Sequence, residues 1–566
     1  MPRPSWAPYL HAFFKVRSRL LQIPFLTLPA EPSPEHPSPP LSSAWAQTRD
    51  SAMASITVPT RPARQRWMWI GLGVLTIVSF LPASPPQGPF DARDGARIPG
   101  VHLEMPLTAV LLEPLAAPVY VLAGAPDFRR AGVATLVWVA LGAAGWWLVR
   151  HRGTKGRRRI LGAAGAGVAA AGLLAAWLGF GVAVRLPGWR LVCDDPAWVV
   201  ADLHTHTYGS HDGLVSADAN LGALAASGYD LVAVTEHKRP AGAFAAVRAA
   251  RSHAPAKPAV IPGVEVRSPL GPYLLGIGLR PGIELPRRNG RGDPSFEARF
   301  VRAVHRDHEG AVIALSYRLS PSDIDRLIDL GVDAFEISNS GHPALEPAVR
   351  RALLAASREQ GIPLIASSDW HGWGGIFRTW TLVRRPPFGT SQAGDVLWLL
   401  RHRRRKAFVP VIAGTFVQPG WFRIVTAPFF ETVRYLSELS PLRVLVWWVW
   451  TGALSFLWAG LRRRGVPRPG RFLLAPSLWI LSAGLGYRGF QWVAVWASGA
   501  TVSSFPAEIG FETVGLALAC AAAGAVSAHR ELRALRGTRA ARGATQAACP
   551  ATDLLPRVAE DAGASG

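Results

Sequence analysis

Two kinds of hydrophobic pattern alternate along the chain. Between residues 195 and 390, short apolar runs alternate with Ala-rich stretches, whereas the flanking segments contain long, uninterrupted apolar runs. The short runs are apolar on both faces, as are the strands of a parallel sheet that helices cover. They lie at 197–203, 230–235, 259–266, 310–316, 332–338 and 362–367. Helices are expected between them at 217–228, 240–253, 294–309, 320–330 and 344–360. This alternation predicts an α/β fold, and the number of units indicates a closed barrel.

The long apolar runs predict membrane-spanning helices, since several reach the length of about 20 residues that crosses a bilayer. The candidate spans are 67–84, 133–149, 160–184, 444–461, 472–486 and 508–528. The run 160–184 is too long and too uniformly apolar for an amphipathic helix. The stretch 106–124 is interrupted by Glu113, Pro114 and Pro118, so it stays open as a span, a re-entrant segment or an interfacial segment.

The net charge of +23 is concentrated beside these predicted spans. The basic clusters lie at 61–66, 150–159, 462–471 and 529–542. This distribution indicates contact with a lipid bilayer and not with nucleic acid. The positive-inside rule places all four clusters in the cytoplasm and the barrel on the extracytoplasmic side of a bacterial inner membrane. The basic run 401–406 opposes this orientation unless it lies on anionic lipid headgroups.

These patterns predict six successive regions. They are a Pro-rich segment at 1–60 that is disordered or precedes the true start, N-terminal helices at 61–190, a barrel at 195–390, a juxtamembrane segment at 391–440, C-terminal helices at 441–530 and a cytoplasmic tail at 531–566. The three cysteines, Cys193, Cys520 and Cys549, are too scattered to suggest a disulfide or a zinc knuckle. Any metal site is therefore expected to use nitrogen and oxygen ligands.

Four polar strings stand at or near the ends of the predicted strands. They are Asp-Leu-His-Thr-His-Thr at 202–207, Thr-Glu-His at 235–237, Gly-Val-Glu at 263–265 and Ser-Asp-Trp-His at 368–371. Side chains two apart in a strand share a face, so each pair of ligand residues points the same way. A core that buried this many imidazoles and carboxylates would need compensating charge, which a metal ion provides.

In combination and order, these strings resemble the polymerase and histidinol phosphatase (PHP) family of metal-dependent phosphoesterases over residues 195–385. The resemblance implies a distorted (β/α)7, TIM-like barrel, inserted here between two groups of transmembrane helices, that holds zinc, manganese or iron. One implied metal site contains His204, His206, Glu265 and Asp369. Another contains His237, His371 and a residue of the turn 210–213, where Asp212 is preferred to His211.

The chain departs from the family pattern at two positions where a further His is usual. It has Gly271-Pro272-Tyr273 at the first position and Ser316-Tyr317 at the second. The third metal site is therefore expected to be lost, which leaves two ions and not three. His342 is either a partial replacement or an ordinary loop residue.

Several cations near the ligand strings are candidates for contact with a phosphate. Lys238 directly follows the string at 235–237, and Arg267 lies two residues after the string at 263–265. Each is either a contact for phosphate or a solvated charge at the rim of the barrel. Arg318 and Arg378 are weaker candidates.

The expected activity is hydrolysis of a phosphate ester by a metal-bound hydroxide, with a phosphorylated small molecule or a lipid-like molecule as substrate. His204, His206, Asp369, Lys238 and Arg267 are the expected catalytic residues. A metal-binding sensor without turnover and a transporter with an accessory barrel remain as alternatives. Amidohydrolase-like barrels often use a carboxylated lysine, but the two lysines at 238 and 257 do not fall at the required strand end.

Overall fold

The computed structural model describes residues 70–547, apart from gaps at 75, 78–87, 124, 126, 154, 253–257, 288–289, 291, 307–308, 341–344, 375–376, 386–390, 415–419, 465 and 467–468. The predicted segment 1–60 and most of the predicted span 67–84 lie outside the described residues. The same holds for the end of the predicted tail 531–566 and for His342 and Lys257.

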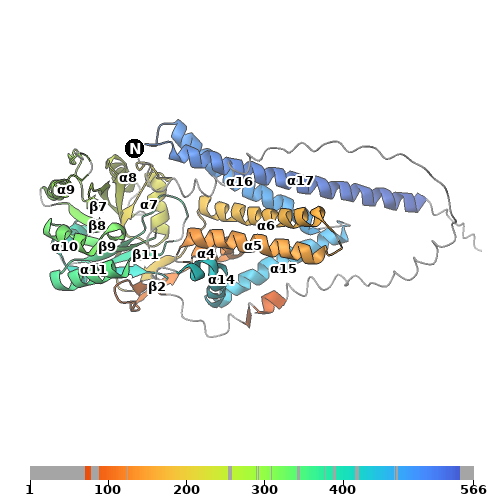
Figure 1. Cartoon of the computed structure of the whole chain (residues 1–566), viewed down its shortest axis with the longest axis horizontal. Helices are drawn as coiled ribbons and strands as arrows, with labels where there is room; N and C mark the ends of the chain where they lie inside the picture. The colour runs from red at the N-terminus through yellow and green to blue at the C-terminus, as the bar shows by residue number, and fades with distance from the viewer. Residues whose placement is uncertain are drawn as a thin grey trace, which may run out of the picture. The chain divides into compact units, whose positions relative to one another are not determined.

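A mixed sheet is the centre of the fold, and ten of its strands fall within the described residues, in the order β1-β12-β11-β4-β5-β6-β7-β8-β9-β10 (Figure 1). The strands are β1 (Phe90–Asp91), β4 (Trp198–Thr205), β5 (Leu231–His237), β6 (Ala259–Arg267), β7 (Tyr273–Ile277), β8 (Ala311–Leu315), β9 (Ala334–Asn339), β10 (Leu364–Ser367), β11 (Thr379–Arg384) and β12 (Phe408–Ile412). A separate antiparallel pair contains β2 (Val101–Glu104) and β3 (Arg190–Cys193). All six predicted strands are therefore confirmed.

The sheet curls, and its far end returns to β4. The backbone N–H of Asp369 donates to the carbonyl of His204 at 2.8 Å, and Thr205 forms an isolated parallel bridge with Trp370. However, β7 is antiparallel to β6 and β8, and β11 is antiparallel to β4 and β12. The tight turn after Arg267, with Gly271 at φ 124°, is too short for a crossover helix and reverses the chain into β7. The architecture is α/β and fits a TIM-like barrel loosely.

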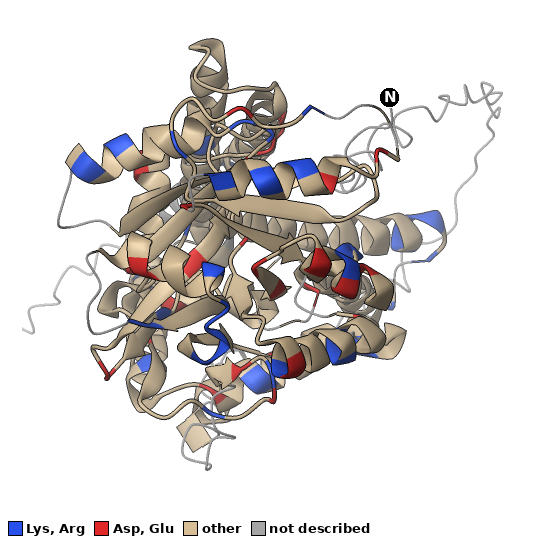
Figure 2. Ribbon diagram, turned by 90° about the vertical axis from the view of Figure 1, so that its left-hand side faces the viewer, with Lys and Arg blue, Asp and Glu red and all other residues tan. Residues whose placement is uncertain are grey.

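Helices cover the outside of this sheet. They are α7 (Ala217–Ala226), α8 (Ala241–Ser252), α9 (Phe296–His305), α10 (Pro321–Asp329) and α11 (Pro347–Gln360). All five helices predicted between strands are confirmed. Figure 2 shows charges of both signs along these helices and few on the strands, as expected for strands that are buried on both faces.

Residues 391–412 belong to the barrel, although the sequence placed them in a juxtamembrane segment. Helix α12 (Gln392–Arg401) packs Leu399 and Leu400 against strand residues such as Ile313 and Ile365 in one apolar cluster. Phe408, at the start of β12, belongs to the same cluster and is fully buried. The sequence of 391–412 shows no long strand–helix alternation, which is why this last unit was missed.

Among the described residues, four helices are long and apolar enough to cross a membrane: α5 (Phe128–Arg150), α6 (Arg157–Ala183), α15 (Pro441–Arg463) and α17 (Phe505–Ala547), for which the apolar part is Phe505–Gly537. A further long helix, α16 (Pro469–Ala497), packs closely against α17, where Gly489 lies against the carbonyl of Gly510. The helical part of the predicted tail at 531–547 continues α17.

The open stretch 106–124 forms two short helices, α3 (Leu107–Leu111) and α4 (Glu113–Ala123). Neither is long enough to cross a bilayer as a single helix. Two more short helices, α13 (Trp421–Val425) and α14 (Ala427–Ser437), precede α15.

The loops at the carboxyl ends of the barrel strands contact the apolar helices. Trp492 in α16 donates its indole N–H to the carbonyl of Leu214 at 3.0 Å. Gly374, in the segment after β10, donates its backbone N–H to the carbonyl of Val182 in α6 at 2.9 Å. The mouth of the barrel therefore lies against the helices, which matters for the polar residues found there.

The placement of 391–412 in the barrel core has a measurable consequence. Phe408→Ala should lower the free energy of unfolding by about 3–5 kcal/mol, because it removes a fully buried aromatic ring. Trp398→Ala, on the exposed side of α12, should cost less than about 1 kcal/mol. Chemical denaturation of the full chain in detergent measures both, and equal small effects would contradict the placement.

Candidate metal centre

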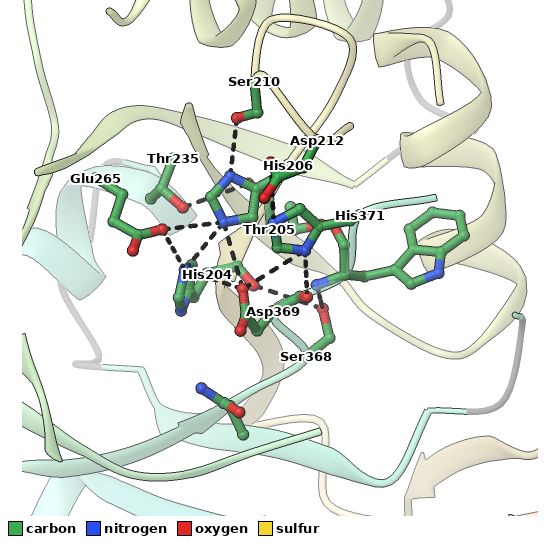
Figure 3. A network of polar contacts seen from close by, with 12 residues as sticks. His204, Thr205, His206, Ser210, Asp212, Thr235, Glu265, Ser368, Asp369 and His371 are labelled. Carbon is green, nitrogen blue, oxygen red and sulfur yellow. Dashed lines mark hydrogen bonds and ion pairs between the residues drawn. The ribbon is translucent and has the colours of Figure 1, made fainter. Parts of the chain in front are cut away.

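The polar strings of the sequence converge at the mouth of the barrel (Figure 3). His204 lies near the end of β4, His237 ends β5, and Glu265 lies in β6. Asp369 and His371 follow β10 directly. Because all of these positions lie at or beyond the carboxyl ends of their strands, the side chains meet at one point although the sequence separates them widely.

The first cluster contains His204, His206, Glu265 and Asp369, all nearly buried. The Nε2 atom of His204 lies 3.0 Å from Nε2 of His206, 3.2 Å from Oε2 of Glu265 and 3.3 Å from Oδ1 of Asp369. The Nε2 atom of His206 lies 3.2 Å and 3.4 Å from the same two oxygens. Ligands about 2.0–2.1 Å from a tetrahedral zinc ion lie about 3.3 Å apart, so this cluster has the size of a coordination shell.

The hydrogen bonds around the two imidazoles fix their tautomers. Nδ1 of His204 lies 3.0 Å from Oε2 of Glu336, a carboxylate that accepts the Nδ1 proton. Ser210 donates its hydroxyl proton to Glu236 at 2.6 Å, so it accepts the Nδ1 proton of His206 at 3.0 Å. Both Nε2 lone pairs then point at the same place, an arrangement that needs a cation between them. These outer contacts are typical of metal-bound histidines.

The second cluster is centred on Asp212. Its Oδ1 atom lies 3.3 Å from Nε2 of His237 and 3.4 Å from Nε2 of His371. The same atom is buried, yet it has no well-oriented hydrogen bond among the described residues. His371 donates its Nδ1 proton to the carbonyl of Asp369 at 2.9 Å, which leaves Nε2 free to bind. Two groups of three residues in this region could hold an ion, one of His206, His237 and His371 and one of His211, Asp212 and His237.

The residue beside Asp212 leaves the choice of ligand in that turn open. Nδ1 of His211 lies 3.6 Å from Oδ1 of Asp212, and both residues can join His237 in a three-ligand group. Asp212 contacts two imidazoles of the second cluster, which favours it as the ligand.

Glu265 connects the two clusters. Its Oε2 atom lies 3.2 Å from Nε2 of both His204 and His206, and 3.3 Å from Nδ1 of His237. Because Nε2 of His237 faces Asp212, Glu265 contacts the other nitrogen of the same ring and so positions His237 from the first cluster. Lys238, next to the site, is exposed, and its charge helps to lower the pKa of His211, after burial.

Electrostatics at the clusters favour positive charge. Burial alone would lower the pKa of His206, but the carboxylates of Asp369 and Glu265 raise it to about 9. Burial alone would raise the pKa of Glu265, yet His237 and His204 hold it well below its usual range. Burial lowers the pKa of His371, which favours the neutral imidazole that binds metal. A divalent ion supplies the charge that these carboxylates require.

The backbone at Asp369 is held in an unusual conformation. Asp369 has φ 50°, in the left-handed region that few residues other than Gly occupy. Its N–H is bonded to the carbonyl of His204, which couples this conformation to the end of β4. Backbone conformations of this kind are often found where a side chain is positioned for function.

The expected third site is occupied by aromatic residues. The rings of Tyr273 and Tyr317 lie 5.7 Å apart, and the charges of Glu265 and Asp369, after burial, raise the pKa of Tyr317. Arg318 lies 5.4 Å from the centre of the Tyr273 ring.

The cations singled out in the sequence divide between two places. Arg267 is exposed at the end of β6 and lies 5.6 Å from the centre of the Tyr273 ring, beside the candidate third site. Arg378 is half-buried, and the charged groups near it are Arg434, Glu438 and Glu431 of the α14 region. Arg378 is therefore not a candidate for contact with ligand at the metal clusters.

Sequence reasoning missed the residues that hold the imidazoles in place. Glu336 lies in a correctly predicted apolar strand, and its other oxygen accepts from the side chain of Asn339 at 2.7 Å. A lone carboxylate near the end of an apolar strand was the available signal. Ser210 and Glu236 had no such signal, because their roles depend on how the loop after β4 folds.

Comparison with known proteins adds little to this geometry. No protein-family model matches the chain, and no curated protein matches it. A protein from Bifidobacterium adolescentis, provisionally named a metal-dependent phosphoesterase, shares 17% identity and a TM-score of 0.25, over 30% of this chain and 87% of its own.

Two further solved structures show similar values. PsfC from Pseudomonas syringae shares 13% identity and a TM-score of 0.28, over 43% of this chain and 99% of its own. An amidohydrolase from Chromobacterium violaceum shares 16% identity and a TM-score of 0.24, over 36% and 96%. At these TM-scores, any functional assignment depends on the side chains of this chain.

The contact between Glu336 and His204 can be tested directly. Glu336→Ala should lower the affinity for a divalent metal by about 10–100-fold, because His204 loses the acceptor that fixes its tautomer. Glu359→Gln, a change to an exposed carboxylate on α11, should leave the affinity unchanged. Competition with a chelator measures both, and an unchanged affinity in Glu336→Ala would contradict the assigned role.

Proposed function

We propose that this chain is a membrane-anchored hydrolase of phosphate esters that depends on two divalent metal ions, with a barrel of the PHP type. The observation that carries the proposal is the first cluster, a buried site in which two Nε2 atoms lie 3.0 Å from each other and 3.2–3.4 Å from two carboxylate oxygens. Bound divalent ions supply Lewis-acid activation of the ester and of water at neutral pH. Zinc, manganese and iron all suit this set of nitrogen and oxygen ligands.

The residues of the chain have separate roles in this proposal. His204, His206, Glu265 and Asp369 hold one ion, and Asp212, His237 and His371 hold the other, with Glu265 between them. Glu336 and Ser210 keep the Nε2 atoms of the histidines unprotonated. These contacts hold the ligands in a fixed geometry before substrate arrives, which lowers the cost of reorganisation.

The surroundings of the site favour a phosphate ester over an amide. Arg267 and Arg318 both lie over the ring of Tyr273, beside the clusters. Their guanidinium groups can pair with the oxygens of a phosphate, and they bring positive charge to the place where the family usually has a third metal ion. Lys238, exposed at the end of β5, is a further candidate for this contact.

One observation also favours a sensor. The loop that carries Asp212 accepts hydrogen bonds from Trp492 of α16, at Leu214, and from Ser503 of the connection between α16 and α17, at His211. A metal-binding barrel without turnover would use such contacts to report occupancy to the helices. The two possibilities differ in whether the metal-loaded chain hydrolyses an ester.

Metal content and turnover test the proposal together. The purified full chain should contain about two ions by elemental analysis, and it should hydrolyse an aryl phosphate. His204→Ala should lower kcat/KM at least about a thousandfold, because ligand loss removes several kcal/mol of metal-assisted stabilisation. Arg358→Gln, on the exposed face of α11, is the matched control. A metal-loaded wild type as inactive as His204→Ala would support the sensor and end the hydrolase proposal.

We also propose that the barrel is extracytoplasmic. The loops between α5 and α6 and between α15 and α16 contain basic clusters, while the opposite ends of α6 and α16 contact the barrel. The positive-inside rule then places the barrel outside. Under this proposal the basic run 401–406 is part of the barrel surface near α12. It is not a loop that flanks a membrane span, so the positive-inside rule does not count its charges.

Cysteine labelling tests this orientation. After the native cysteines are replaced by Ser, Glu359→Cys in the barrel should react with a membrane-impermeant maleimide in intact cells. Gly153→Cys, between α5 and α6, should react only after permeabilisation, since an apolar span separates the two positions. The reverse pattern would place the barrel in the cytoplasm.

A further inference from the structure

Two arginines lie where the apolar helices meet the mouth of the barrel. Arg185 follows the end of α6, and Arg488 lies in the last third of α16. The Nε atom of Arg488 donates to the carbonyl of Ala183 at 3.0 Å, so the second arginine reaches the turn that carries the first. Neither residue has a part in the proposed metal sites.

These arginines have no acidic partner within the described part of the chain. No carboxylate there lies within ion-pair distance of either guanidinium, although Nη1 of Arg488 donates to the side chain of Gln491 at 2.7 Å. Nη2 of Arg488 is buried and makes no hydrogen bond to the described residues. Burial, together with the charge of Arg488, lowers the pKa of Arg185 to about 10. Two uncompensated cations at partial burial are costly unless an anion binds them.

Aromatic rings surround the pair. The Arg185 guanidinium lies 5.7 Å from the centre of the Trp370 ring, and that of Arg488 lies 5.0 Å from the centre of the Trp492 ring. Tyr208 is close enough to both for their charges to oppose the rise in its pKa that burial causes. Arginine beside Trp and Tyr at the end of an apolar helix is typical of the headgroup level of a bilayer.

The position of Arg185 agrees with that level. Helix α6 is long and apolar enough to cross a membrane, and it ends at Ala183, two residues before Arg185. Arg488 is placed at the same end of α6 by its hydrogen bond to the carbonyl of Ala183. Both guanidinium groups therefore lie near the barrel-side end of a candidate membrane span.

We propose that Arg185 and Arg488 bind the phosphate group of an anionic membrane lipid. A guanidinium group donates two parallel hydrogen bonds to a phosphate, which would satisfy the orphaned Nη2 of Arg488 and offset the charge of both residues. The position at headgroup level selects a lipid phosphate over a free one. This site does not depend on the proposed hydrolysis, although Tyr208 and Trp370 each lie within two residues of a proposed metal ligand.

Calorimetry with a short-chain lipid tests the site. The full chain, purified in an uncharged detergent with EDTA so that bound metal cannot hold phosphate, is titrated with dihexanoyl phosphatidylglycerol. We expect saturable binding that weakens at least about tenfold in Arg185→Gln and in Arg488→Gln, since each variant loses charge-assisted hydrogen bonds. Arg185→Lys and Arg488→Lys, which keep the charge, should weaken binding less than the matching Gln variants.

Three controls make the result decisive. Arg358→Gln should bind the lipid as the wild type does, and each variant must elute and melt like the wild type. Dihexanoyl phosphatidylcholine, with a neutralised headgroup, should bind at least about tenfold more weakly. Equal affinity for the Gln variants, or for phosphatidylcholine, overturns the proposal. If inorganic phosphate displaces the lipid when both are at the same concentration, the site does not select a lipid phosphate over a free one, and that part of the proposal is wrong. Because no metal or turnover enters this measurement, either result leaves the hydrolase proposal to its own test.

Discussion

The barrel mouth depends on how the charge of Glu265 is compensated. One oxygen of this buried carboxylate faces imidazole nitrogens from three histidines, which come from β4, the loop after it and β5. A carboxylate removed from water is stable only with a cation or several hydrogen-bond donors. Protons on the Nε2 atoms can provide part of that compensation, since, despite burial, nearby carboxylates raise the pKa of His206 to about 9, while the Nδ1 protons of His204 and His206 are used elsewhere. Metal ions in both clusters satisfy all of these groups together, which links the fold of the mouth to its proposed chemistry.

The sequence predicted the parts of the barrel that have strong periodicity. Every strand and helix expected between 197 and 367 is present, because apolar runs buried on both faces leave a clear pattern. The short strands β7, β11 and β12 were missed, since apolar runs of five or six residues resemble loops in a single sequence. Because β7 and β11 are antiparallel to their neighbours, the sheet is mixed, whereas the sequence predicted a parallel one. The ligand residues were visible as polar strings at strand ends, whereas Glu336 and Ser210 act only through contacts that the fold creates.

The aromatic pair at the candidate third site affects the balance of positive and negative charge at the mouth of the barrel. Tyr273 and Tyr317 add neutral bulk, and burial together with nearby carboxylates keeps Tyr317 protonated at physiological pH. The guanidinium groups of Arg267 and Arg318 lie above the Tyr273 ring and bring positive charge to this place. A guanidinium group pairs with phosphate without activating water, so under the proposed function these arginines would bind the ester while the two clusters would hold the activating ions.

The loop from Tyr208 to Leu214 joins the metal clusters to the helices. It is too tight for a larger residue at Gly213, where a Cβ atom would lie 1.8 Å from the carbonyl of Thr207. The same short loop presents Asp212 to two imidazoles and offers the carbonyl of Leu214 to Trp492. Under the proposed function, a change in the contact of this loop with metal would also change its contact with α16. Metal occupancy and helix packing would then be thermodynamically linked, equally in both directions. A lipid headgroup bound beside Tyr208 would act on the same loop from the membrane side.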